Sequence, residues 1–173
     1  MRELADADRI RAFIRALGRE ADIEGTCYLT GGATAVLVGW RATTIDVDLL
    51  LLPESDALLR AIQRLKDELR INVELASPAD FIPVRPGWDE RGVFVAREGG
   101  LSFYHFDPVA QALAKLERGH RQDLDDVRAM LDCGLVDRGQ ALRDFDEIEP
   151  ELYRFPAVDP AAFRARVEAA LTP

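Results

Sequence analysis

Two aspartates, Asp46 and Asp48, lie within residues 43–52, whose apolar content predicts a β-strand. Side chains alternate along a strand, so carboxylates two residues apart point to the same face. Like charges that close repel each other, and in an apolar strand they need a compensating cation. Carboxylate oxygens are hard ligands that suit Mg²⁺ or Mn²⁺. The pair therefore predicts a divalent-cation site.

A glycine pair, Gly31 and Gly32, precedes this strand and is followed by a short predicted helix over 33–38. Glycine permits close backbone approach, and amides at the start of a helix can be directed at a phosphate. Nearby polar side chains that could contact phosphate or brace the site are Thr34, Arg41 and Thr44. A cation site beside an anion-binding turn is an arrangement suited to phosphoryl chemistry.

The remaining chain must position these groups. Apolar periodicity predicts helices over 4–17, ending at Gly18, and over 54–69. The further predicted strands cover 26–29, 71–76, 93–96 and 101–106, the last two as a hairpin. The apolar run on either side of the two aspartates predicts that strand 43–52 is buried on both faces.

After Asp107 and Pro108, which suit a helix cap and a first helical position, the pattern becomes helical. The predicted helices are 109–118, 123–131, 137–145 and 160–171. We expect an α/β (α+β) fold, in which residues 1–106 form a small mixed sheet with flanking helices. Residues 107–173 form a helical half that we expect to pack on it.

Composition narrows the class of protein. The 173 residues include 48% hydrophobic and 31% charged residues, a balance that excludes a largely disordered chain. No uninterrupted apolar run reaches the roughly 20 residues of a membrane span, and the N-terminus does not resemble a signal peptide, so we expect a cytoplasmic protein. The net charge of −9 argues against a broad basic face for nucleic acid.

The ordered set of motifs resembles the nucleotidyltransferase superfamily that shares the DNA polymerase β-like palm. The glycine pair, the short helix and the Asp-x-Asp strand carry this resemblance. The finer pattern is similar to the AbiEii-type toxin and related bacterial nucleotidyltransferase-like branch, which also has a lysine helix and an Asp-x-x-Asp helix. Here these correspond to Lys115, Asp123 and Asp126. Gln122 stands where a basic residue is usual in that branch.

The resemblance implies a Mg²⁺-dependent transfer of a nucleoside monophosphate from an NTP to RNA, protein or a small molecule. It also implies a toxin role with an antitoxin protein as partner. Asp46 and Asp48 would hold the metal with a third carboxylate, for which Glu74 is the first candidate and Asp80 the second. Lys115 would contact the triphosphate.

Two alternatives stay open at this point. Asp123 and Asp126 either orient Lys115 or the nucleophile, or are acidic residues favoured at the start of a helix. The whole chain is either an active transferase, or a degenerate nucleotidyltransferase fold that serves as a nucleotide-binding or protein-interaction module. A third carboxylate at the aspartate pair would favour the enzyme.

Overall fold

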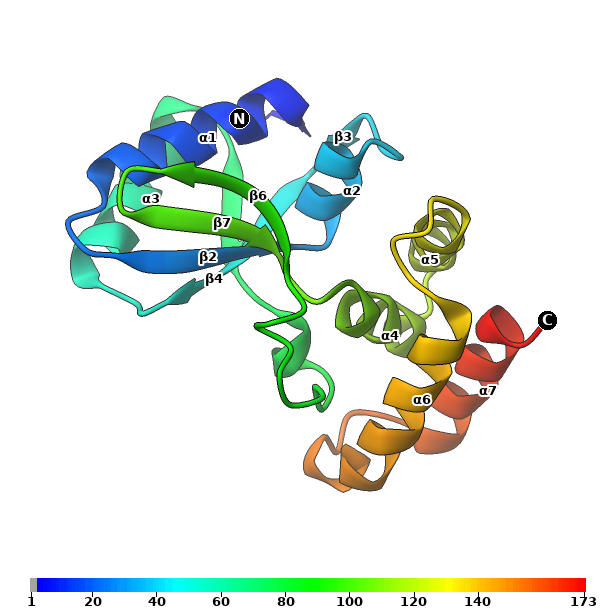
Figure 1. Cartoon of the computed structure of the whole chain (residues 1–173). Coiled ribbons are helices and arrows are strands. Elements are labelled where there is room, and N and C mark those ends of the chain that lie inside the picture. The colour runs from blue at the N-terminus through cyan, green and yellow to red at the C-terminus, as the bar shows by residue number, and fades with distance from the viewer. Residues whose placement is uncertain (1–2) are drawn as a thin grey trace. The chain divides into compact units, whose positions relative to one another are not determined.

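The computed structural model describes residues 3–173 and divides the chain into two compact units (Figure 1). Unit 1 comprises Met1–Ser77 and Gly92–His105, and unit 2 comprises Pro78–Arg91 and Phe106–Pro173. The irregular segment before Gly92 thus groups with the C-terminal helices rather than with the sheet. The mixed α/β architecture confirms the predicted fold class.

Unit 1 is built on a five-stranded mixed sheet with the order β5-β4-β2-β7-β6. Its strands are β2 (Gly25–Thr30), β4 (Asp46–Leu52), β5 (Asn72–Leu75), β6 (Val93–Glu98) and β7 (Leu101–His105). Strand β2 pairs antiparallel with β4 and parallel with β7, while β4 and β5 are parallel. The predicted hairpin is confirmed as the antiparallel pair β6–β7. A separate two-stranded sheet joins β1 (Ala5–Asp6) to β3 (Thr43–Thr44).

Helices α1 (Ala7–Glu20) and α3 (Asp56–Glu68) pack on one face of this sheet (Figure 1). Each begins at a side-chain cap, Asp6 for α1 and Ser55 for α3, which accepts a backbone N–H three residues on. Helix α1 continues past Gly18, so the predicted stop there is wrong. Gly18 instead lies against the backbone of Glu98, where a side chain would overlap it.

Strand β4 is buried mainly on one face, which corrects the prediction of burial on both. Val47, Leu49 and Leu51 lie in the core under α1 and α3. Asp46 and Asp48 alternate with them and are half-buried on the opposite face. The apolar residues of a strand therefore do not reveal how many of its faces are covered, because the covering elements are distant in sequence.

Unit 2 is helical after Phe106. Its helices are α4 (Pro108–Arg118), α5 (Arg121–Asp132), α6 (Arg138–Ile148) and α7 (Pro160–Leu171), with the 3₁₀ segments η1 (Pro78–Asp80) and η2 (Glu149–Arg154). Asp107 caps α4 by accepting the N–H of Val109, as predicted. Phe145 and Phe163 meet edge to face at 4.9 Å and join α6 to α7 in the core of this unit.

Within residues 3–173 we find no helix long and apolar enough to cross a membrane.

Candidate active site

The turn between β2 and α2 (Gly32–Val38) brings the backbone against the aspartate pair. Gly31 has φ 61° and ψ −127°, a conformation that is essentially restricted to glycine. A Cβ on Gly31 would lie 2.9 Å from Oδ2 of Asp48. The sequence therefore uses glycine here because both the backbone conformation and the space next to Asp48 require it.

Gly32 makes a second close approach, to Thr44, whose side chain occupies the position that a Cβ of Gly32 would take. Thr44 is buried, and its Oγ1 donates to the carbonyl oxygen of Asp46 at 3.0 Å. The hydroxyl thus braces the corner where β3 passes into β4. Its predicted contact with phosphate stays a prediction.

Thr34, in the first turn of α2, meets a histidine that the sequence analysis did not place in the site. Its Oγ1 shares a hydrogen bond of 2.9 Å with Nδ1 of His105, the last residue of β7, and also donates to the carbonyl oxygen of Leu29 at 3.4 Å. Both side chains are buried, and burial lowers the pKa of His105 to about 4. A neutral polar pair therefore anchors the start of α2 to the sheet.

Arg41 lies three residues after the end of α2. Its backbone N–H donates to the carbonyl oxygen of Ala35 at 3.2 Å, one of three amides that share this acceptor at the end of the helix. Arg41 is half-buried and lies two residues before β3. Whether its guanidinium contacts phosphate stays a prediction.

The carboxylates of the candidate site lie on two adjacent strands. The parallel register of β4 and β5 pairs Asp46 with Asn72 and Asp48 with Glu74. Val47 and Val73, between these pairs, are in the core, so the four polar residues share the opposite face. Asn72 donates from Nδ2 to Oδ1 of Asp46, and the same nitrogen lies 3.4 Å from Oε1 of Glu74.

Asp80, the second candidate for a third carboxylate, lies in η1 and belongs to unit 2. Glu74 is exposed on β5, whereas Asp46 and Asp48 are half-buried. Over residues 3–173, no three His, Cys, Asp or Glu side chains converge into a ready metal-ion cluster. The oxygen donors of Asp46 and Asp48 nevertheless suit a hard cation in type, and the register places Glu74 as the neighbouring acid.

Lys115, on helix α4 of unit 2, belongs to a cluster of charged side chains that is largely buried. Lys115 on α4 is 6% exposed, and its Nζ donates to Oδ2 of Asp126 on α5 at 2.6 Å. Asp123 is 3.9 Å from the same ammonium group but makes its closer contacts to Arg118, at 2.5 and 2.8 Å, and to the N–H of His120. Asp126 is thus the direct partner of Lys115, while Asp123 joins α4 to the start of α5.

The Arg118 contact also explains the ionisation of Asp123. Burial raises the pKa of Asp123, but the hydrogen bonds and charge of Arg118, with the charge of Lys115 and the backbone N–H of His120, outweigh it. The net pKa is lowered. Asp126 thus contacts Lys115, Asp123 lies in the first turn of α5, and the functional roles of both aspartates stay predictions.

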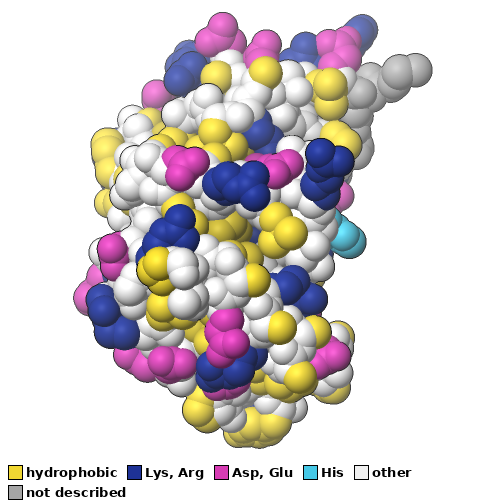
Figure 2. Space-filling model, turned by 90° about the vertical axis from the view of Figure 1, so that its right-hand side faces the viewer, with side chains coloured by type: hydrophobic (Ala, Val, Ile, Leu, Met, Phe, Trp, Pro, Cys, Tyr) yellow, Lys and Arg dark blue, Asp and Glu magenta, His cyan; other side chains and the backbone are white. Residues whose placement is uncertain are grey.

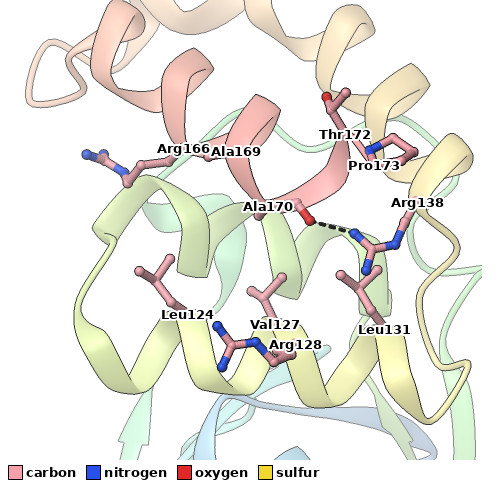
Figure 3. A pocket seen from close by; sticks show the side chains of 10 residues that line it. All are labelled: Leu124, Val127, Arg128, Leu131, Arg138, Arg166, Ala169, Ala170, Thr172 and Pro173. Carbon is pink, nitrogen blue, oxygen red and sulfur yellow. Dashed lines mark hydrogen bonds between the residues drawn. The ribbon is translucent and has the colours of Figure 1, made fainter.

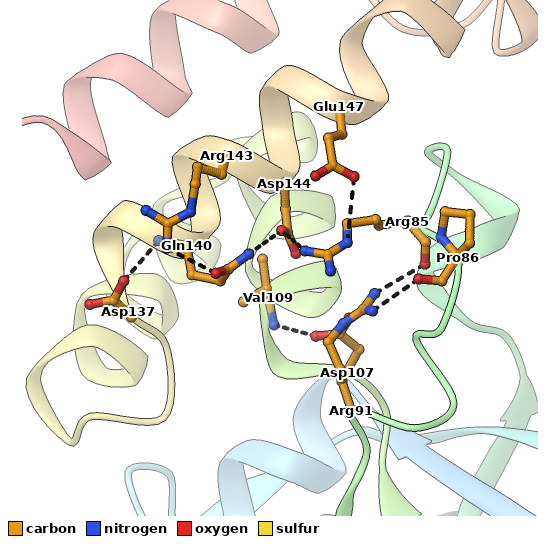
Figure 4. A network of polar contacts seen from close by, with 10 residues as sticks. All are labelled: Arg85, Pro86, Arg91, Asp107, Val109, Asp137, Gln140, Arg143, Asp144 and Glu147. Atoms are coloured by element: carbon orange, nitrogen blue, oxygen red, sulfur yellow. Dashed lines mark hydrogen bonds and ion pairs between the residues drawn. The ribbon is translucent and has the colours of Figure 1, made fainter.

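A second polar network holds the segment before Gly92 against the helices of unit 2 (Figure 4). Arg91 donates to Asp107 at 2.7 Å and to the carbonyl oxygens of Pro86 and Arg85. Arg85 in turn donates to Asp144 of α6 at 2.6 Å. These bonds give the segment a fixed course without regular secondary structure.

Unit 2 also has a groove of about 560 Å³ between α5 and the end of α7 (Figure 3). Its lining includes Val127, Arg128 and Leu131 of α5 and Arg138 of α6. Arg138 donates to the carbonyl oxygen of Ala170 at 2.7 Å and so ties α6 to α7. The aspartate pair, by contrast, lies on β4 of unit 1.

The face of the molecule in Figure 2 has basic and acidic side chains interspersed with hydrophobic ones. No broad basic area is visible on that face, in line with the net charge of −9.

A comparison with known protein families identifies the broad class of this protein. Residues 7–156 match the family described as "Nucleotidyltransferase of unknown function (DUF6036)". The chain belongs to this family. The superfamily suggested by the glycine pair and the Asp-x-Asp strand is thereby confirmed, whereas the AbiEii-type branch is not. No curated protein and no solved structure matches the chain.

Sequence reasoning missed Asn72 and His105 as parts of this site. Both contacts join residues far apart in the chain, 26 positions for Asn72 with Asp46 and 71 for His105 with Thr34. The alternation of side chains along residues 71–76 predicts which face of the strand carries Asn72. It does not predict which strand lies next to it. The one available signal was that Asn72 is the only asparagine in the sequence.

Proposed function

We propose that this nucleotidyltransferase family member transfers a nucleoside monophosphate from an NTP to an acceptor and depends on Mg²⁺ or Mn²⁺. The observation that carries the proposal is the approach of the Gly31 backbone to Asp48, where a Cβ would lie only 2.9 Å from the carboxylate. Because Gly31 has no side chain, the backbone of the turn, whose amides could bind phosphate, lies directly beside oxygen donors that suit a divalent cation.

Each of these residues would have a separate role in the transfer. Asp46 and Asp48 would hold the cation, which when bound supplies charge neutralisation and orientation for the triphosphate. Gly31 and Gly32 would allow the phosphates to approach the backbone. Glu74, beside Asp48 in the register, would accept the proton of the acceptor hydroxyl.

In the transfer, the acceptor oxygen forms a bond to the α-phosphorus of the NTP. The bond from that phosphorus to the bridging oxygen of the β-phosphate breaks, and pyrophosphate leaves with its electron pair. Most of the rate enhancement in such reactions comes from positioning and charge stabilisation. A contact of Lys115, on α4 of unit 2, with the triphosphate rests on the motif resemblance alone, and the ion pair with Asp126 fixes its ammonium group within that unit.

The acceptor would be RNA, protein or a small molecule. A toxin role, neutralised by an antitoxin protein, is the finer form of the proposal and rests on motif resemblance alone. It would appear as growth arrest on expression that is relieved by Asp46→Ala.

The test is transfer of label from α-phosphate-labelled NTPs, with Mg²⁺ and either total RNA or total protein as acceptor. We expect Asp48→Asn to lower the transfer rate by about 100-fold or more, because it removes a charged cation ligand. Asp67→Asn, on the exposed side of α3, is the matched control and should transfer at the wild-type rate. Equal rates in wild type and Asp48→Asn would rule out the proposed role of this pair.

One observation favours a second candidate function, a degenerate module that binds nucleotide or a protein partner without transfer. Over residues 3–173 no three acidic, histidine or cysteine side chains form a ready metal cluster. NTP binding by calorimetry with no transfer to any acceptor would support this candidate over the enzyme.

A further inference from the structure

Asn72 lies on the face of the sheet in unit 1 that carries the candidate carboxylates. It is half-buried on β5, directly opposite Asp46 in the register, and it shares its face with Asp48 and Glu74. Its Nδ2 donates to Oδ1 of Asp46, and Oε1 of Glu74 lies 3.4 Å from the same nitrogen. One neutral side chain thus connects carboxylates on two adjacent strands.

The chemistry of the amide matters at this position. Neighbouring strands are about 4.8 Å apart, so carboxylates on β4 and β5 repel each other unless something compensates. A lysine or arginine here would compensate the charge, but it would also compete with a cation for the same oxygens. An amide can donate to carboxylates without bringing a charge, so it can fix their orientation and leave the site negative.

We propose that Asn72 is a positioning residue, whose amide ties Asp46 of β4 to Glu74 of β5 and so orients the Asp46 carboxylate for the divalent cation that Asp46 and Asp48 would bind. This inference rests on the proposed function, because it assumes that Asp46 and Asp48 bind a cation. It adds a residue for which neither the motifs nor the family description gives a role. Outer partners of metal ligands affect affinity by about 10-fold or more in known sites.

Mn²⁺ titration of the full chain, followed by electron paramagnetic resonance of the free ion, tests the proposal without any need for activity. Asn72→Leu removes the amide at similar volume and should weaken Mn²⁺ binding about 10-fold. Asn72→Gln keeps an amide on a longer side chain and should retain most of the affinity. Gln63→Leu, which removes an exposed amide from α3, is the matched control and should bind as wild type.

The relative Mn²⁺ affinities of Asn72→Leu and Asn72→Gln distinguish a positioning role from a packing role. If Asn72 only fills space, Leu is tolerated and the longer Gln is the more damaging change, and that result overturns the proposal. Wild-type affinity in a folded Asn72→Leu variant also overturns it, while the metal-dependent transferase stands. If the wild type itself binds no Mn²⁺, the proposed function fails, and the positioning role fails with it.

Discussion

Two groups of polar residues, one in each unit, make different kinds of contact. In unit 1, the contacts of Asp46 and Thr34 are neutral, namely the Asn72 amide on Asp46 and the Thr34–His105 hydrogen bond. Ion pairs such as Arg9–Glu3 occur elsewhere in this unit. In unit 2, the polar residues around α4 are joined by ion pairs, which include Lys115–Asp126, Arg118–Asp123, Arg91–Asp107 and Arg85–Asp144.

This difference separates charges that stabilise the fold from charges that can bind a ligand. A buried carboxylate already paired with an ammonium or guanidinium group has its charge compensated, and adding a cation gains little. A carboxylate that receives only an amide keeps its negative charge and can bind a metal ion. The comparison therefore favours Asp46 over Asp123 or Asp126 as a cation ligand.

The largest effect should come from Lys115→Met in unit 2. Removal of the ammonium group leaves Asp126 buried without its ion-pair partner, which we expect to lower the free energy of unfolding by about 3 to 5 kcal/mol. Urea denaturation measures this loss. Lys66→Met, at the only other lysine of the chain, is the control and should change stability little.

The double variant Lys115→Met/Asp126→Leu tests whether the loss comes from the unpaired charge of Asp126. It replaces the pair by apolar side chains and should recover most of the lost stability. No loss in the single variant would mean that the pair does not stabilise unit 2, and the contrast between the units would then be wrong.

His105 should make the stability of unit 1 depend on pH. Its pKa is lowered to about 4 in the folded state, so between the unfolded value of about 6.5 and 4 the unfolded chain binds the extra proton. Stability is then complete above pH of about 6.5 and falls by up to about 3 kcal/mol as the pH drops to about 4.

The measurement is the free energy of unfolding across this pH range, as the difference between wild type and His105→Gln. The variant lacks the titrating ring, so the difference should vary with pH. His120→Gln, at the only other histidine and exposed in unit 2, is the control and should follow the wild-type profile. Parallel profiles for wild type and His105→Gln would show that the histidine is not held neutral by burial.

The smallest of the three effects should follow Gly31→Ala. The backbone conformation is unfavourable for alanine, and the new Cβ would lie 2.9 Å from Asp48, so we expect a loss of about 2 kcal/mol together with weaker Mn²⁺ binding. Gly39→Ala is the matched control. Gly39 also has positive φ, at 113°, but a Cβ there would meet nothing within 4 Å.

Gly39→Ala should therefore lose stability without losing cation affinity. If both variants lose affinity equally, strain in α2 rather than contact with Asp48 is the cause. That outcome would remove the observation on which the proposed function depends most.

The class of fold and the helices and strands that carry the candidate residues could be predicted from the amino-acid sequence. Periodicity of 2 and of 3.6 residues is local, so it predicted the strand of Asp46, the hairpin and the helices after Asp107. The order of the glycine pair and the Asp-x-Asp strand was enough to identify the nucleotidyltransferase superfamily, since each motif needs only nearby residues.

The three-dimensional fold was needed to show which residues surround these motifs. Strand order and register placed Asn72 beside Asp46, and the parallel pairing of β2 and β7 brought His105 to Thr34. It also showed that β4 is covered on one face, and that Lys115 has Asp126 rather than Asp123 as its closest acid. These facts depend on contacts between distant segments, which neither local propensity nor spacing along the chain encodes.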